Sequence, residues 1–103
     1  MNTPSPLSKL ELFFRPRGVA VIGASRDPQK LGHGVVRNLV NYGYEGPIYP
    51  INPHANTILD RKAYPSVHDA PDPLDLAVLI VPAPKVPAEL TTCGERGIPA
   101  AII

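Results

Sequence analysis

The chain has 103 residues, of which 44% are apolar and 18% are charged, and this balance is typical of a single globular domain. Its net charge of +1 argues against a nucleic-acid-binding protein with a strongly basic face. No apolar run approaches the roughly 18 residues that a membrane-spanning helix needs, and the first residues do not form a secretory signal. We therefore expect a cytoplasmic protein with neither a membrane nor a nucleic acid as partner.

The first half of the chain predicts a strand followed by a helix. Residues 1–8 are polar and rich in proline and predict a flexible leader, so the domain is expected to occupy residues 9–103. Residues 18–23 are apolar on both faces, as in the middle of a parallel sheet. After a loop at 24–30, apolar residues at helical spacing predict a helix over 31–42.

The second half repeats the alternation. Strands are predicted at 47–51 and 76–81, separated by a stretch at 54–75 that predicts mostly connection. A helix over 85–96 and a strand over 98–103 follow, and Cys93 is expected as a small buried side chain of that helix. The order indicates an α/β fold, a Rossmann-like open parallel sheet with helices on both faces, which we expect to be truncated after its fourth strand.

The loop after the first strand has the composition of a phosphate-binding loop. In open parallel sheets, ligands bind beyond the carboxyl ends of the strands. Gly23 permits a tight turn, Ser25 supplies a hydroxyl and a backbone N–H, and Arg26 and Lys30 supply positive charge. The following helix directs its free N–H groups back at the loop, so we expect a phosphate or pyrophosphate there.

This loop does not match the dinucleotide fingerprint, because Ser25 and Pro28 stand where that motif has its second and third glycines. After the second strand, Asn52 stands where NAD enzymes usually place an acid. The absence of a carboxylate there is compatible with a phosphorylated ribose, as in coenzyme A or NADP. After the third strand, residues 82–84 form a proline-edged turn that suits one wall of a nucleotide slot.

No catalytic set is evident from the spacing of polar residues. There is neither a paired His and Cys with metal-ligand spacing nor a P-loop. The histidines stand alone and are expected at the surface or at helix caps: His33, His54 and His68. Three acidic residues of the proline-rich connection are expected to be solvated: Asp69, Asp72 and Asp75.

An ordered series of short segments resembles the CoA-binding domain of NDP-forming acyl-CoA synthetases, a group that includes ADP-forming acetate–CoA ligase and, more distantly, the succinyl-CoA synthetase alpha subunit. The resemblance covers nearly all of residues 10–103. The segments that carry it are residues 13–25 (FFRPRGVAVIGAS), 30–32 (KLG), 49–53 (YPINP), 63–67 (AYPSV), 75–78 (DLAV) and 81–84 (VPAP).

The resemblance implies coenzyme A as the ligand. It implies that the loop from Gly23 to Arg26 grips the CoA phosphates, that Asn52 and Pro53 lie beside the adenosine end, and that the third strand ends at the edge of the same slot. The CoA-binding residues that it implies are Gly23, Ala24, Ser25, Arg26, Lys30, Asn52, Pro53, Val81 and Pro82. A lysine that succinyl-CoA synthetases carry after the second strand is replaced by Ala55.

The resemblance also implies a larger enzyme, in which carboxylate, CoA and ATP give acyl-CoA, ADP and phosphate. The family uses a phosphorylated histidine in a later domain and an ATP-grasp domain or beta subunit, and no histidine of this chain matches that catalytic position. This part is therefore expected to bind CoA without catalysing. Three alternatives remain open: a stand-alone or acetyltransferase-linked CoA-binding module, an NADP-binding oxidoreductase domain, and a fold that serves assembly alone.

Overall fold

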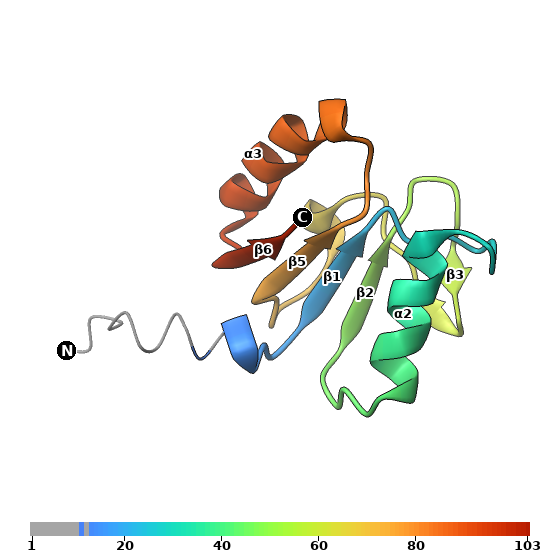
Figure 1. The fold of residues 1–103 in the computed structure, drawn as a ribbon. Helices are drawn as coiled ribbons and strands as arrows, with labels where there is room; N and C mark the ends of the chain where they lie inside the picture. Colours follow the sequence, from blue (N-terminus) through green and yellow to red (C-terminus); the bar gives the residue numbers. More distant parts are fainter. Residues whose placement is uncertain (1–10, 12) are drawn as a thin grey trace.

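Four parallel strands form the central sheet of the computed structural model, which describes residue 11 and residues 13–103 (Figure 1). Their order across the sheet is β2-β1-β5-β6. Their bounds are Val19–Ile22 for β1, Ile48–Ile51 for β2, Leu76–Leu79 for β5 and Ala100–Ile102 for β6. The open parallel sheet that the sequence predicts is thus confirmed, whereas the leader predicted at residues 1–8 lies outside the described residues.

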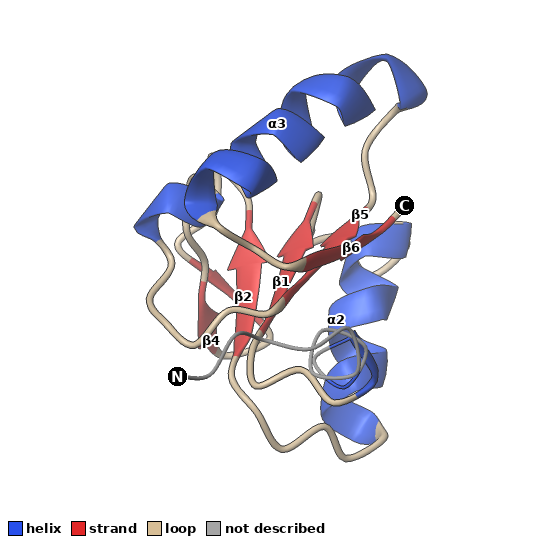
Figure 2. Cartoon of the chain, turned by 90° about the vertical axis from the view of Figure 1, so that its left-hand side faces the viewer, coloured by secondary structure: helices blue, strands red, loops and turns tan. Residues whose placement is uncertain are grey.

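Two helices cover the sheet, one on each face. Helix α2 (Leu31–Asn41) links β1 to β2, and helix α3 (Val86–Arg96) links β5 to β6 after a short 3₁₀ turn, η2 (Ala83–Lys85). Figure 2 shows α2 and α3 on opposite sides of the strands. The helices follow the prediction closely, because their apolar positions recur at the spacing that packs one side of a helix onto a sheet.

The alternation of side chains along β1 builds two cores. Val19 and Val21 pack with Val36 of α2, while Ala20 and Ile22 belong to the cluster on the α3 side. Successive side chains of a strand point to opposite faces, so a strand buried on both faces must be apolar at every position. Cys93 of α3 lies in the second cluster as a buried thiol, as predicted.

The connection between β2 and β5 contains more structure than the sequence predicts. Two-residue strands, β3 (Thr57–Ile58) and β4 (Arg61–Lys62), pair as an antiparallel hairpin, and a 3₁₀ turn, η1 (Val67–Asp69), follows. The segment between β4 and η1 runs along the edge of β2, where the Tyr64 N–H donates to the Pro50 carbonyl over 2.9 Å. This path carries η1 to the carboxyl end of the sheet.

The prediction that Asp75 is solvated is wrong, because only 2% of the surface of this residue is exposed. Its two carboxylate oxygens accept hydrogen bonds from the Arg17 guanidinium over 2.8 and 2.9 Å, and the Arg17 backbone N–H donates a third over 2.8 Å. These bonds hold the pKa of Asp75 below its ordinary value. The pair joins the segment before β1 to the segment before β5, 58 residues apart.

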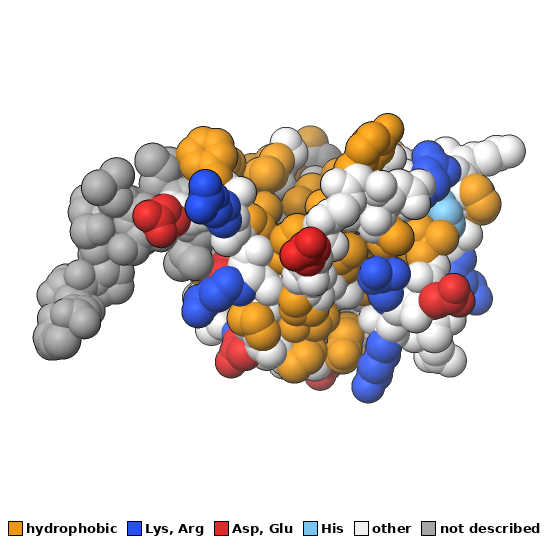
Figure 3. Space-filling view, turned by 90° about the horizontal axis from the view of Figure 1, so that it is seen from below, with side chains coloured by type: hydrophobic (Ala, Val, Ile, Leu, Met, Phe, Trp, Pro, Cys, Tyr) orange, Lys and Arg blue, Asp and Glu red, His pale blue; other side chains and the backbone are white. Residues whose placement is uncertain are grey.

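The surface seen from below carries charges of both signs around a group of apolar side chains (Figure 3). No single-sign patch dominates this view, in agreement with the net charge of +1. In the part of the chain that the structure describes, neither helix is long and apolar enough to cross a bilayer.

Candidate functional site

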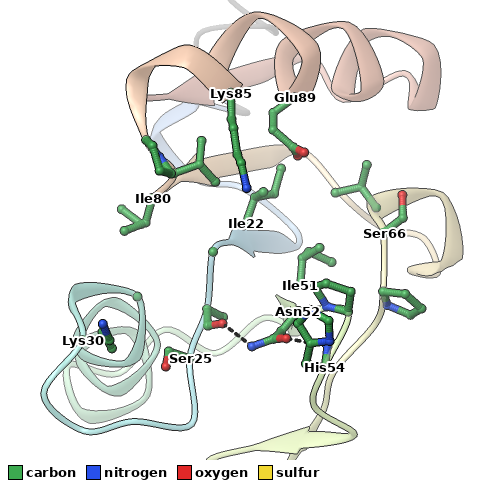
Figure 4. Close-up of a pocket in the computed structure, with 18 of the residues that line it drawn as sticks. Ile22, Ser25, Lys30, Ile51, Asn52, His54, Ser66, Ile80, Lys85 and Glu89 are labelled. Atoms are coloured by element: carbon green, nitrogen blue, oxygen red, sulfur yellow. Dashed lines mark hydrogen bonds between the residues drawn. The ribbon is translucent and has the colours of Figure 1, made fainter.

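A cavity of about 640 Å³ opens beyond the carboxyl ends of β1, β2 and β5 (Figure 4). The connection after β1 leads through α2 to one side of the sheet, whereas the connection after β5 leads through α3 to the other. The two loops therefore diverge, and this switch point is where open α/β sheets bind ligands. Parts of η1 and α3 close the cavity on a further side.

The structure brings eight of the nine predicted site residues to this cavity. The exception, Arg26, is exposed in the loop after β1 and does not line the cavity. The eight residues that line it are Gly23, Ala24, Ser25, Lys30, Asn52, Pro53, Val81 and Pro82.

Two glycines let α2 begin close to the end of β1. Gly23 has a φ of 94°, which side-chain-bearing residues rarely adopt, and a Cβ there would overlap the carbonyl oxygen of Ile80. A Cβ on Gly32, in the first turn of α2, would overlap the carbonyl oxygen of Gly23. The start of α2 therefore packs directly against the backbone of the loop, which brings its N–H groups to the rim of the cavity.

The start of α2 has the charge distribution of an anion site. Lys30 is the N-cap residue, no side chain caps the helix, and its first turn contains no acidic residue. The Ser25 hydroxyl accepts from the Asp27 N–H over 3.0 Å, which leaves its own proton free to donate. Uncapped N–H groups, the positive end of the helix dipole and the Lys30 ammonium together favour a phosphate here.

His33 has a structural role in this loop, in contrast to the surface or capping position expected for it. The residue is buried, and its Nδ1 lies 2.9 Å from the Ser25 carbonyl oxygen. A carbonyl oxygen can only accept, so Nδ1 carries the proton of this bond. His33 thereby fixes the backbone of Ser25 from the first turn of α2.

Asn52 joins the loops after β1 and β2. Its Nδ2 donates to the Ala24 carbonyl oxygen over 2.9 Å, and its Oδ1 accepts from the His54 N–H over 2.7 Å (Figure 4). Both ends of the side-chain amide are therefore used to set the spacing between two walls of the cavity. Ala55 lies just beyond and is buried.

The sequence did not reveal the wall that α3 and η1 contribute. Lys85, the N-cap residue of α3, and Glu89 and Thr92 of α3 recur at helical spacing and line the cavity, opposite Ser66 beside η1. Figure 4 shows the side chains of Lys85, at the end of η2, and Glu89, in α3, extending into the cavity. The spacing of the three residues was a signal that one face of α3 is polar, but only the packing of α3 shows that this face meets the cavity.

The charged groups of the described residues do not form a metal site. No group of three or more His, Cys, Asp or Glu side chains is suitably placed to hold a metal ion within residues 11 and 13–103. The chemistry of the cavity is therefore that of hydroxyls, amides, lysines and helix N–H groups.

Known proteins are similar to this chain in sequence and in fold. A family model described as "CoA binding domain" matches residues 17–103. An ADP-forming acetate–CoA ligase II of Archaeoglobus fulgidus is 49% identical over 91 residues, which are 88% of this chain and 14% of that protein. The alpha subunit of an ADP-forming acetate–CoA ligase I of Pyrococcus furiosus is 47% identical over 93 residues, 86% of this chain and 20% of the subunit.

A solved structure shows the same arrangement. The dinucleotide-forming acetyl-coenzyme A synthetase 1 of Ca. Korarchaeum cryptofilum, in its apo form, superposes with a TM-score of 0.84 at 47% identity. The match covers 86% of this chain and 19% of that one. The chain thus spans a fifth or less of the length of each of these relatives.

Proposed function

Since the chain belongs to the CoA-binding domain family, whose model covers residues 17–103, we propose that it binds coenzyme A in the cavity at the carboxyl end of the sheet. The observation that carries the proposal is the coincidence of this cavity with an uncapped helix N-terminus, a free hydroxyl and a lysine. Donors of this kind favour the binding of a diphosphate, and the cavity is large enough for part of a nucleotide.

In the proposed complex, the CoA diphosphate lies against the loop from Gly23 to Ser25 and the N-terminus of α2, with Lys30 as its cation. The adenosine end lies beside Asn52 and Pro53, and the turn that follows β5 forms the opposite edge of the slot. Arg26, which is exposed outside the cavity, acts on the ligand by long-range attraction.

We further propose that the chain is the CoA-binding part of a multidomain acyl-CoA ligase. The support is that two relatives at 49% and 47% identity are named ADP-forming acetate–CoA ligases and are several times longer. The reaction is carboxylate plus CoA plus ATP giving acyl-CoA, ADP and phosphate, with an ATP-grasp domain or subunit as partner. No residue of this chain is assigned a catalytic role, so its task is to bind and orient CoA.

Calorimetric titration with CoA, NADPH and NAD tests the binding proposal. We expect saturable CoA binding that weakens about tenfold in Ser25→Ala, because one charge-assisted hydrogen bond to phosphate is lost. Thr91→Ala is the matched control, since Thr91 is exposed on α3 outside the cavity and should leave the affinity unchanged. Binding of NADPH without CoA would replace the proposal with a redox role, and binding of none of the three would reject it.

The ligase proposal is tested separately, by measuring ADP and phosphate release from ATP with acetate and CoA in the complete protein that carries this domain. Release that depends on both acetate and CoA supports the proposal. CoA binding without acid-dependent ATP cleavage, tested across short and aromatic carboxylates, favours a CoA-binding module with another role.

A further inference from the structure

The cavity contains a second cation, Lys85, on the wall opposite Lys30. Lys30 is the N-cap residue of α2 on one face of the sheet, and Lys85 is the N-cap residue of α3 on the other face. Both residues line the same cavity. Figure 4 shows the Lys85 side chain extending from the start of α3 toward Ile22, the residue that precedes the loop after β1 (residues 23–30, the phosphate loop).

The placement of Lys85 is not explained by the stability of α3. A cation at a helix N-terminus interacts unfavourably with the helix dipole. Lys85 also precedes Glu89 by four residues, which is the weaker order for an ion pair on a helix surface. Within the described residues, the Lys85 ammonium forms no ion pair, including with Glu89, so it remains free to meet a ligand.

Glu89 defines where along α3 an anion can lie. Its half-buried side chain lines the cavity one turn after Lys85 and has no ion-pair partner among the described residues. A carboxylate repels phosphate, and Pro87, between the two residues, has no N–H to donate. The attractive part of this wall is therefore confined to Lys85, at the mouth of the phosphate loop.

We propose that Lys85 is a second diphosphate-binding residue, which holds the diphosphate from the α3 wall while Ser25, Lys30 and the start of α2 hold it from the other. The inference rests on the proposed function. A diphosphate bears two anionic phosphates, and the two walls present one lysine each to the space between them. Glu89 keeps the phosphates at the Lys85 end of the wall and leaves its far end to neutral parts of the ligand.

Calorimetric titration of the 103-residue chain and its Lys85→Met, Lys85→Arg, Glu89→Gln and Lys62→Met variants tests this proposal, with CoA and 3′-dephospho-CoA as ligands. We expect Lys85→Met to weaken both ligands by about tenfold, because both contain the diphosphate. Lys85→Arg should restore most of the affinity, and Lys85→Met should lower the dependence of affinity on salt concentration. Glu89→Gln should bind CoA severalfold more tightly, because the repulsion between its carboxylate and the phosphates is removed. Lys62→Met is the matched control, since Lys62 is exposed on β4 outside the cavity and should leave the affinity unchanged.

Three results would overturn the assignment of Lys85 while CoA binding itself stands. The first is an unchanged affinity of Lys85→Met for both ligands, and the second is a loss of affinity for CoA alone, which would place Lys85 at the ribose 3′-phosphate. The third is a loss of affinity in Glu89→Gln as large as the loss in Lys85→Met. Failure of the unchanged chain to bind CoA would instead reject the proposed function together with this inference. Circular dichroism of each variant shows whether the fold is retained.

Discussion

Gly32 determines how closely the first turn of α2 approaches the phosphate loop. A methyl group there would meet the Gly23 carbonyl oxygen, so Gly32→Ala must move the helix away from the loop. We expect a loss of about 1–3 kcal/mol in the free energy of unfolding and a CoA affinity weakened by tenfold or more. Chemical denaturation and calorimetric titration measure the two effects.

Gly34 provides the control for this substitution, because it lies in the same helix with open space around its Cβ position. The nearest atom to that position is in the flexible Arg37 side chain, at 3.5 Å. Gly34→Ala should therefore stabilise the chain by about 0.5–1 kcal/mol through helix propensity and leave CoA binding intact. Equal behaviour of the two variants would show that the contact between Gly32 and Gly23 does not matter.

The buried Asp75 makes stability depend on pH in a defined direction. The Arg17 hydrogen bonds lower the pKa of the folded-state carboxylate, so the pair stabilises the fold fully above the unfolded-state pKa of about 4. The contribution is lost as the pH falls through the lowered folded-state pKa. The Tm of the unchanged chain should thus exceed that of Asp75→Asn at pH 7, and the difference should shrink below about pH 4. A difference that is constant from pH 7 to pH 2 would contradict this account.

At the scale of elements, the β3–β4 hairpin turns through two side-chain-bearing residues in a conformation that glycine adopts with less strain. Leu59 and Asp60 have φ values of 50° and 63°, in the left-handed region that favours Gly and Asn. We expect Asp60→Gly to raise the free energy of unfolding by about 1 kcal/mol in chemical denaturation, because the strain of one side chain is removed. Asp60→Ala keeps the Cβ and should bring no gain; a gain of equal size would mean that the charge, rather than the backbone, is unfavourable.

The elements that the sequence predicted are those with local signals. β1 is a continuous apolar run between two glycines, and β5 begins a continuous apolar run that ends at Pro82. α2 and α3 carry apolar residues at helical spacing. The hairpin escaped prediction because its strands have two residues each and its turn lacks the Asn-Gly pair that marks such turns.

The residues of the candidate site also divide into those that the sequence predicts and those that it does not. The predicted residues follow β1, β2 and β5, and the carboxyl ends of parallel strands meet at one edge of the sheet, so their meeting could be predicted. Lys85 and Glu89 reach the cavity only through the rotation of α3 about its own axis, which the core around Cys93 sets. The pairing of Asp75 with Arg17 joins distant segments and has no local signal.

At the scale of the whole molecule, the cavity lies at the carboxyl edge of the sheet, between the helix on one face and the helix on the other. The lining residues come from the loops after three strands, from the start of α2 and from α3, so both helical layers contribute. A ligand that contacts all of these segments must be released before either layer separates from the sheet. Binding is therefore expected to stabilise the domain as one unit.

CoA should consequently raise the midpoint of global thermal unfolding. Free CoA at 100 times its Kd adds about 2.7 kcal/mol to the stability of a one-site protein, which for about 100 residues corresponds to a rise in Tm of 10 °C or more. Thermal unfolding followed by circular dichroism at increasing CoA concentration measures this rise. The Lys85→Met variant should show an equal rise when the free CoA concentration is 100 times the variant's own Kd for CoA, which is expected to be higher. Saturable binding with an unchanged Tm would mean that CoA occupies a segment that opens independently of the sheet, because only a ligand held by both helical layers couples to the unfolding of the whole domain.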